Sequence, residues 1–253
     1  MYEQKLFTTK ATKWIALAGN LISSFENIHG ILGLNEIYID NSFYNYVEWV
    51  PGSSLVVSLG GTCKKDVLNS VKELLRVDND LANLIIAEGR TSEALYHWRT
   101  LYSRVLEVFL DNIVGFLKSK TVVTNSKRIE YMLLVSRKGE GVVLQGDVDR
   151  IRIPRVRAWL IAHTHPSPHS FFSPKDMETS RDLFVNQGLL SAVVTSTTIC
   201  VLYRCGDMDV DDYEKLILIE RKLAKDKVRE ALKLMSRLKS VRLVLKGVYL
   251  NLR

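Results

Sequence analysis

The sequence predicts an α/β protein, because its second half alternates strand-like apolar segments with a well-delimited helix. The strand-like segments occupy residues 131–135, 157–165 and 191–204, and the helix lies between the last two. The first half contains mainly segments with helical periodicity. We therefore expect strands flanked by helices in the C-terminal half, preceded by a mainly helical α+β domain.

The N-terminal domain is expected to span residues 1–120, and no motif assigns it a function. Helices are expected in TKWIALAGNLISSFENIHGIL, KKDVLNSVKELL and DNDLANLIIAEG, with a long closing helix in TSEALYHWRTLYSRVLEVFLDNIVGFLKSK. The aromatic-rich NEIYIDNSFYNYVEWV is strand-like. Residues 118–127 (KSKTVVTNSK) are rich in small polar and basic side chains, so they mark the expected domain boundary.

A histidine-rich strand end is the first chemical feature of the C-terminal half. Three of the five histidines fall between residues 163 and 169. Residues 157–165 (RAWLIAHTH) predict a buried strand, so His163 and His165 project side by side from one face at its end. Pro166 and Pro168 then exclude continued strand pairing and force a loop.

A helix start follows this loop in the sequence SPKDMETSRDLFVNQG. Ser173 is a natural N-cap, Pro174 fits the first helical position, and Asp176 comes three residues after the cap. Gly188 is expected to end the helix. Taken alone, Ser173 is explained as a cap and Asp176 as a first-turn carboxylate favoured by the helix dipole.

The joint spacing of these residues predicts a metal site. His163, His165 and Asp176 provide three nitrogen or oxygen ligands, and the fourth tetrahedral position stays open for water, as in catalytic zinc sites. Such a site lowers the pKa of bound water to about 7. Mn²⁺ and Fe²⁺ could use the same ligands, but we expect one zinc ion. His169 is expected in the loop, solvated or beside the site and not bound to the metal.

The pattern His163-x-His165 followed by Ser173-x-x-Asp176 resembles the JAMM motif of the MPN+ zinc metalloprotease family. Seven residues separate His165 from Ser173, as in the family motif. The resemblance covers only the C-terminal half, residues 126–207. It implies a deaminase-like JAMM domain, a mixed sheet flanked by helices in three layers, and zinc coordination by the two histidines and the aspartate.

The same resemblance implies an upstream glutamate that acts as general base toward the metal-activated water. Glu130 opens the apolar run 131–135, whereas Glu140 lies in the hairpin sequence RKGEG and points to water. A carboxylate buried near a metal can have the raised pKa that proton transfer requires, so Glu130 is the expected base. Ser173 is expected to donate a hydrogen bond to the oxyanion, a contact of the kind worth about 2.7–4 kcal/mol in other hydrolases.

The JAMM-like core is expected to span residues 121–210. The segment after it, residues 211–253, is expected to form a C-terminal helix and one or two closing strands. Residues 211–240 predict one long helix with acids at its start and bases toward its end, as the helix dipole favours. Leu216, Ile219, Leu223, Leu232, Met235 and Leu238 form its apolar stripe. This stripe is expected to pack on its own domain or on a twin subunit in a homodimer. A basic docking face for nucleic acid on the same helix is the alternative.

Composition sets the remaining limits. The chain has 253 residues and 47% hydrophobic content, enough for a substantial core in one or two domains. No apolar stretch approaches 18 residues, so neither a membrane span nor a secretory signal is expected. Cys63, Cys200 and Cys205 lack paired metal-ligand spacing. Cys200 and Cys205 are expected to be reduced thiols, and the chain is expected to be cytoplasmic.

Three function classes fit these observations. The leading one is a zinc isopeptidase or peptidase (a hydrolase) that processes protein substrates carrying ubiquitin-like modifiers. The net charge of +7 raises a RadC-like, nucleic-acid-associated accessory protein as an alternative, but no Gly-rich phosphate-binding signature accompanies it, so nucleic acid is not expected as a partner. A non-catalytic MPN scaffold is the third class, and the presence of all the motif residues argues against it.

Overall fold

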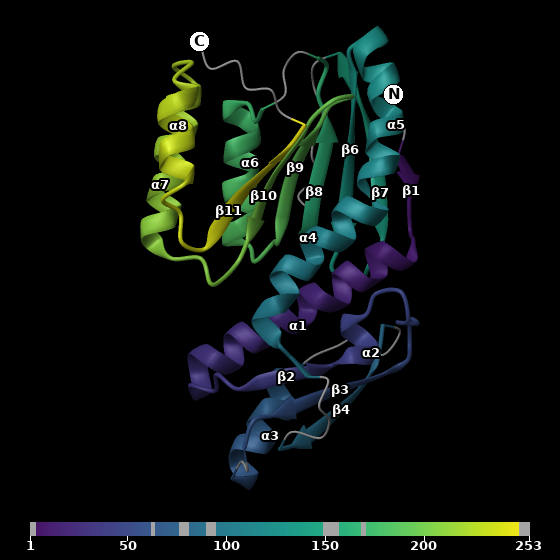
Figure 1. The fold of residues 1–253 in the computed structure, drawn as a ribbon, viewed down its shortest axis with the longest axis vertical. Helices are drawn as coiled ribbons and strands as arrows, with labels where there is room; N and C mark the ends of the chain where they lie inside the picture. Colours follow the sequence, from purple (N-terminus) through teal and green to yellow (C-terminus); the bar gives the residue numbers. More distant parts are fainter. Residues whose placement is uncertain are drawn as a thin grey trace.

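The computed structural model describes residues 4–61, 64–75, 81–89, 95–148, 157–167 and 171–247 (Figure 1). Seven strands form the larger of two sheets, in the order β1-β7-β6-β8-β9-β10-β11. These strands are β1 (Gln4–Leu6), β6 (Ile129–Ser136), β7 (Gly141–Val148), β8 (Ala158–Thr164), β9 (Leu190–Val194), β10 (Ile199–Arg204) and β11 (Val241–Lys246). β8 and β9 run parallel, whereas the other neighbouring pairs are antiparallel. The sheet is therefore mixed, as expected.

Helices cover both faces of this sheet. One face packs against α1 (Lys10–Leu32), α4 (Leu101–Asn112) and α5 (Val114–Lys127), and the other against α6 (Pro174–Val185), α7 (Val210–Leu223) and α8 (Val228–Met235). Alternate side chains of β6 go to opposite faces: Leu133 and Val135 join the first core, and Met132 and Leu134 the second. β8 lies between β6 and β9, and every one of its residues is buried. This double burial explains why its sequence is continuously apolar up to His163.

A smaller sheet packs on the other side of α1 (Figure 1). Its order is β4-β3-β2-β5. The elements of this part are β2 (Ile37–Asp40), α2 (Asn41–Tyr44), β3 (Ser54–Leu59), α3 (Lys65–Leu74), β4 (Asn83–Glu88), β5 (Leu95–His97) and the 3₁₀ helix η1 (Trp98–Thr100). The core beneath α1 continues from this sheet into the larger one. α1 lies very close to the larger sheet at Gly19, where a Cβ atom would lie 2.4 Å from the ring of Trp159 on β8.

The structure corrects two expectations for the N-terminal half. The sequence DNDLANLIIAEG does not form a helix, because residues 83–88 form β4, paired in parallel with β3. The β-branched pair Ile85–Ile86 favours this strand, and Gly89, at φ 75°, ends it. The expected long closing helix of residues 91–120 is divided: among the described residues, β5 and η1 precede α4, and α5 begins after Ile113. The expected boundary segment, residues 118–127, lies within α5.

Two expectations about helix ends in the C-terminal half are corrected as well. Residues 211–240 form α7 and α8 instead of one long helix, and the turn between them contains Asp226 at φ 55°. The left-handed residue after α6 is Gln187, at φ 65°, and not Gly188. Gly188 is needed for a different reason: a Cβ atom there would lie 2.3 Å from Leu183 Cδ1. Of the expected closing strands, β11 is observed, and residues 248–253 lie outside the described part of the chain.

Among the described residues, each helix is too short or too polar to cross a bilayer.

A buried ion pair joins the N-terminal helices to the C-terminal end of β10. Arg204 donates to the carboxylate of Glu26 on α1 and to Gly206 O at 3.1 Å, and Tyr102 of α4 donates to the same carboxylate. The side chains of Arg204 and Glu26 are only 2% and 9% exposed. Burial raises the pKa of Glu26 to about 7, although Arg204 and the Tyr102 hydroxyl act in the opposite direction.

Protonation of Glu26 should therefore make stability fall as the pH rises. Between its unfolded pKa of about 4.3 and its folded pKa of about 7, the folded chain holds a proton that the unfolded chain has released. We expect the free energy of unfolding to fall by about 2–3 kcal/mol between pH 5 and pH 8 through this group. Urea denaturation at several pH values measures this change, and Glu26→Gln should remove it.

The control is Glu107→Gln, because Glu107 forms an exposed ion pair with Arg104 on α4. This variant should keep the pH dependence of the natural chain. An unchanged pH dependence in Glu26→Gln would show that Glu26 is ionised throughout this range.

Candidate metal centre

The end of β8 positions the two histidines of the predicted site. His163 lies opposite Met132 of β6 and Val193 of β9 in the sheet register. His165 follows the strand directly, and its N–H donates to Val194 O at 3.0 Å, so the backbone stays extended for one more residue. Because side chains alternate along extended backbone, both imidazoles point to the face covered by α6.

The start of α6 positions the aspartate. Ser173 is the N-cap, and Asp176 N–H donates to Ser173 Oγ at 3.2 Å, while Ser173 N–H donates to Asp176 Oδ2 at 2.7 Å. This reciprocal capping box holds the carboxylate at the helix N-terminus, where the helix dipole favours negative charge. The predicted cap is confirmed, and Ser180 adds a second anchor by donating to Ser191 Oγ of β9 at 2.7 Å.

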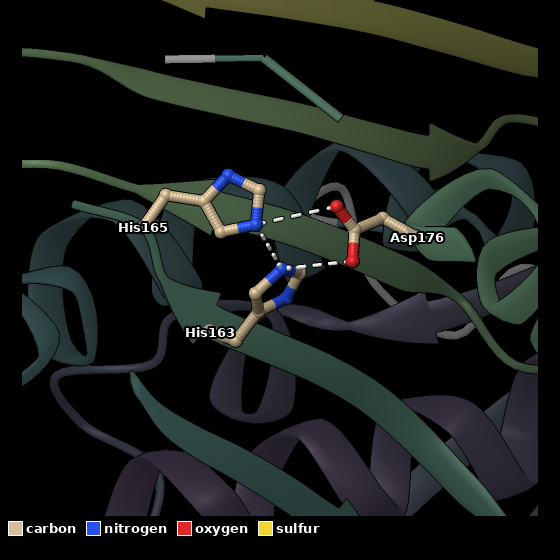
Figure 2. A group of neighbouring side chains, drawn as sticks. All are labelled: His163, His165 and Asp176. Carbon is tan, nitrogen blue, oxygen red and sulfur yellow. Dashed lines mark hydrogen bonds and ion pairs between the residues drawn. The ribbon is translucent and has the colours of Figure 1, made fainter. Parts of the chain in front are cut away.

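The three predicted ligand side chains converge on one point (Figure 2). The Nε2 atoms of His163 and His165 lie 2.9 Å apart. His163 Nε2 is 3.1 Å from Asp176 Oδ1, and His165 Nε2 is 3.3 Å from Asp176 Oδ2. Each imidazole therefore faces one oxygen of the same carboxylate.

This spacing fits a tetrahedral metal ion. Zinc bonds of about 2.0–2.1 Å place neighbouring donor atoms of a tetrahedron about 3.3 Å apart. The two Nε2 atoms are 2.9 Å apart, each lies 3.1 or 3.3 Å from one of the two oxygens of Asp176, and one ligand atom of each residue lies within 4.8 Å of the other two. Two imidazoles and one carboxylate are also a donor set that zinc, Mn²⁺ and Fe²⁺ accept. The residues present could thus hold such an ion with little movement.

Burial makes the electrostatic coupling in this cluster strong. His163 and His165 are 4% and 7% exposed. Burial opposes ionisation of Asp176, but the two imidazoles outweigh it and hold the pKa of this carboxyl well below its usual range. Burial also lowers the pKa of His163, yet Asp176 and Glu130 raise it overall. The cluster is therefore arranged to keep negative charge on the carboxylate beside a cation.

The orientation of both imidazole rings depends on the contacts that their Nε2 atoms make with each other and with Asp176. The Nδ1 atoms of His163 and His165 are buried, and among the described residues neither has a hydrogen-bond partner. The polar contacts that orient the imidazoles are consequently those of the Nε2 atoms with each other and with Asp176.

The sheet register places Glu130, and not Glu140, at this end of β6. Met132 pairs with His163 at the end of the β6–β8 ladder, and continuing this antiparallel register by two residues brings Glu130 opposite His165. The pairing of β6 with β7 is irregular between Ile129 and Tyr131, so Glu130 lies at a bulge, a feature that can redirect a side chain. Its charge helps to raise the pKa of His163.

Glu140 lies at the opposite end of β6. It is exposed in the turn before β7 and accepts a hydrogen bond from Ser136 Oγ at 3.3 Å. Ser136 pairs with Ala158, the first residue of β8, whereas the metal centre lies at the last residues of that strand. Glu140 therefore cannot reach the site.

Ser173 lies beside the carboxylate, with its hydroxyl oxygen accepting the Asp176 N–H. A serine hydroxyl can donate one hydrogen bond in addition to those that it accepts. In the described part of the chain, no hydrogen bond donated by this hydroxyl is recorded, which leaves its proton for a ligand at the site. The predicted loop histidine, His169, lies outside the described residues.

Sequence reasoning missed a threonine pair behind the site. Thr164, between the two histidines, turns to the opposite face, and its Oγ1 lies 2.8 Å from Thr124 Oγ1 of α5. The same oxygen accepts the Tyr131 N–H at 2.9 Å. Asn125, the next residue of α5, accepts the Ser167 N–H at 2.9 Å. These contacts fix β6 next to Glu130 and the loop after His165, and nothing in the sequence brings α5 to this place.

A second acidic group, Asp209, Asp211 and Asp212, has a structural explanation. Asp209 caps α7, and Asp212 accepts hydrogen bonds from the backbone N–H groups of Lys239 and Ser240 at 2.8 and 2.7 Å. Asp212 thus fixes the turn between α8 and β11.

Comparisons with protein-family models, with curated proteins and with solved structures found no match to this chain.

Removing the Thr164 hydroxyl should destabilise the fold. Thr164→Val keeps the shape of the side chain but removes the acceptor of the Tyr131 N–H and the hydroxyl partner of Thr124. We expect a loss of about 1–3 kcal/mol in the free energy of unfolding, measured by urea denaturation.

A double-mutant cycle with Thr124→Val isolates the contact between the two hydroxyls. Thr179→Val on α6 is the control, because within the described part of the chain that hydroxyl bonds only to Lys175 O of its own helix. Equal small effects of Thr164→Val and Thr179→Val would contradict a role for Thr164 in holding β6 to β8.

Proposed function

We propose that this chain is a zinc-dependent peptidase or isopeptidase of the JAMM type. The observation that carries the proposal is the convergence of His163, His165 and Asp176 on one point, with Glu130 opposite His165 in the continued register and Ser173 next to the carboxylate. The mixed sheet with helices on both faces is compatible with a deaminase-like JAMM domain.

His163 and His165 would hold the zinc ion through Nε2, and Asp176 through a carboxylate oxygen. Zinc bound there would supply a Lewis acid and lower the pKa of water toward neutrality. A protein set of three ligands leaves one position for the reaction.

Glu130 would act as the general base and acid. Its carboxylate takes a proton from the attacking water and passes it to the leaving amine. Its position opposite His165 supports this role, as does its half-buried site at a bulge of β6. General acid–base catalysis of this kind contributes about 10²–10⁴ to the rate.

Ser173 would stabilise the oxyanion that forms at the scissile carbonyl. Its hydroxyl oxygen is fixed by the Asp176 N–H, so its proton can be directed at a substrate oxygen without reorganisation of the helix start.

The proposed substrates are proteins conjugated to ubiquitin-like modifiers. The connection from α6 to β9 is short, because Gly188 and Leu189 lead directly into a strand that starts at Leu190. A long insertion that grips a modifier is therefore absent at this connection, and we propose no specificity for a chain linkage.

The purified chain should bind one zinc ion, and Asp176→Asn should weaken binding by about two orders of magnitude or more, because one charged ligand is lost. Elemental analysis and competition with a chromophoric chelator measure this. The control is Asp182→Asn, an exposed carboxylate on the same helix, which should bind zinc normally. Equal zinc affinity in Asp176→Asn and Asp182→Asn would exclude the proposed ligand set.

Glu130→Gln should lower the rate of cleavage by about 10²-fold or more while the zinc content stays unchanged, because the ligands remain and the base is lost. The assay uses a panel of linear and isopeptide-linked modifier conjugates, with zinc and with chelator. Glu140→Gln is the control and should cleave at the natural rate. If no conjugate of the panel is cleaved in a zinc-dependent manner, the proposed activity is wrong. If Glu130→Gln keeps full activity, the assignment of Glu130 as the base is wrong.

A further inference from the structure

The positive charge of the chain is concentrated in one short segment. Residues 221–239 contain eight lysines and arginines and two acids, a net charge of +6, whereas the whole chain has +7. This segment is the end of α7, the turn after it, α8 and the turn before β11. Figure 1 shows α7 and α8 as the outermost helices on their side of the larger sheet.

The structure separates an apolar face of α8 from a charged one. Ala231 and Met235 are buried in the core beneath α7 and α8, so the apolar stripe has its partner within the chain. Arg229 and Lys233 of α8 are exposed, and so is Arg237 in the turn that follows the helix. We call these three residues, together with the exposed Arg221, Lys225 and Lys227, the cationic face.

The two acids of the segment are too few to neutralise its eight lysines and arginines. Glu230 is shared by Lys222 at 2.5 Å and Lys227 at 3.0 Å. No ion pair of Lys233 or Arg237 is found in the described ranges. Like charges close together repel each other, so an anion bound from outside the chain would stabilise this arrangement.

The composition of the cationic face favours phosphate groups over an acidic protein or a membrane. Protein interfaces depend on apolar and aromatic anchors, and among the described residues from 221 to 247 no large hydrophobic side chain is exposed. A helix bound to a membrane inserts its apolar face, but that face of α8 is already buried. Nucleic-acid backbones require only lysine and arginine at the contact.

We propose that the cationic face binds the phosphate backbone of double-stranded nucleic acid, without sequence preference. Residues 221–247 contain no asparagine or glutamine, the side chains that read adenine in pairs of hydrogen bonds, and we assign the lysines and arginines of the face to phosphate contacts. This inference goes beyond the proposed hydrolase and does not depend on the metal centre. It differs from the leading expectation drawn from the sequence, in which the same charges belonged to one long packed helix.

Fluorescence anisotropy of a labelled DNA duplex of about 25 base pairs tests the proposal over a range of salt concentrations. We expect the full-length chain to bind at low salt. Its association constant should fall with the salt concentration raised to an exponent of about three or more. The triple variant Lys225→Gln, Lys233→Gln, Arg237→Gln should bind about 10-fold or more weakly at low salt and reduce that exponent by about 2–3.

The matched control neutralises three lysines of the smaller sheet's helix, Lys64→Gln, Lys65→Gln and Lys72→Gln, which are also exposed. It should bind DNA within about 2-fold of the natural chain. His163→Ala should bind DNA normally, so failure of the metal centre and failure of the cationic face are distinguishable.

Three outcomes would overturn the proposal: no DNA binding at low salt, equal losses in the triple variant and its control, or binding only to vesicles that contain phosphatidylserine.

Discussion

Placing two imidazoles and a carboxylate together in a buried position is the constraint on which the rest of this structure depends. A buried charge without a partner is strongly unfavourable, so His163, His165 and Asp176 are tolerated only because they face one another. Their convergence requires that β8 end and α6 begin at fixed places. The rigidity of these two places comes from different sources.

β8 is fixed by its position in the middle of the sheet. It is paired on both sides and covered on both faces, by α1 at Trp159 and by the α6 layer at Ile161. α6 is fixed by its own first turn, because the capping box uses the same aspartate that faces the histidines. One side chain thus satisfies the helix start and completes the cluster, which couples the local structure of the helix to the chemistry of the site.

The sequence predicted those parts of the site that depend on local rules. A two-residue spacing on a strand and a three-residue spacing after a cap are set by backbone geometry alone, so the two histidines, Ser173 and Asp176 could be assigned before the structure was known. Glu130 could be preferred over Glu140 by burial, but its place opposite His165 depends on the pairing of β6 with β8. The contact of Thr124 with Thr164 spans 40 positions and has no local signal.

The errors in the predicted fold have two physical origins. Arg128, Gln187 and Asp226, the described residues other than glycine with positive φ, all follow helices. Sequence rules expect glycine at such positions, so the break between α7 and α8 had no signal. β4 was missed for another reason: its apolar run is too short for periodicity to distinguish a strand from a helix, and its pairing with β3 decides the outcome.

The N-terminal half supports the site from the face of the larger sheet opposite α6. α1 packs on β8 through Gly19, and α5 holds the strand end through Thr124 and the following loop through Asn125. The buried pair of Glu26 and Arg204 ties α1 to β10 at the other end of the sheet. Because the helices of the first half hold β8 and β10 in place, a change in their packing reaches the histidines through the backbone of β8. The catalytic chemistry proposed for the second half therefore depends on contacts that only the complete fold provides.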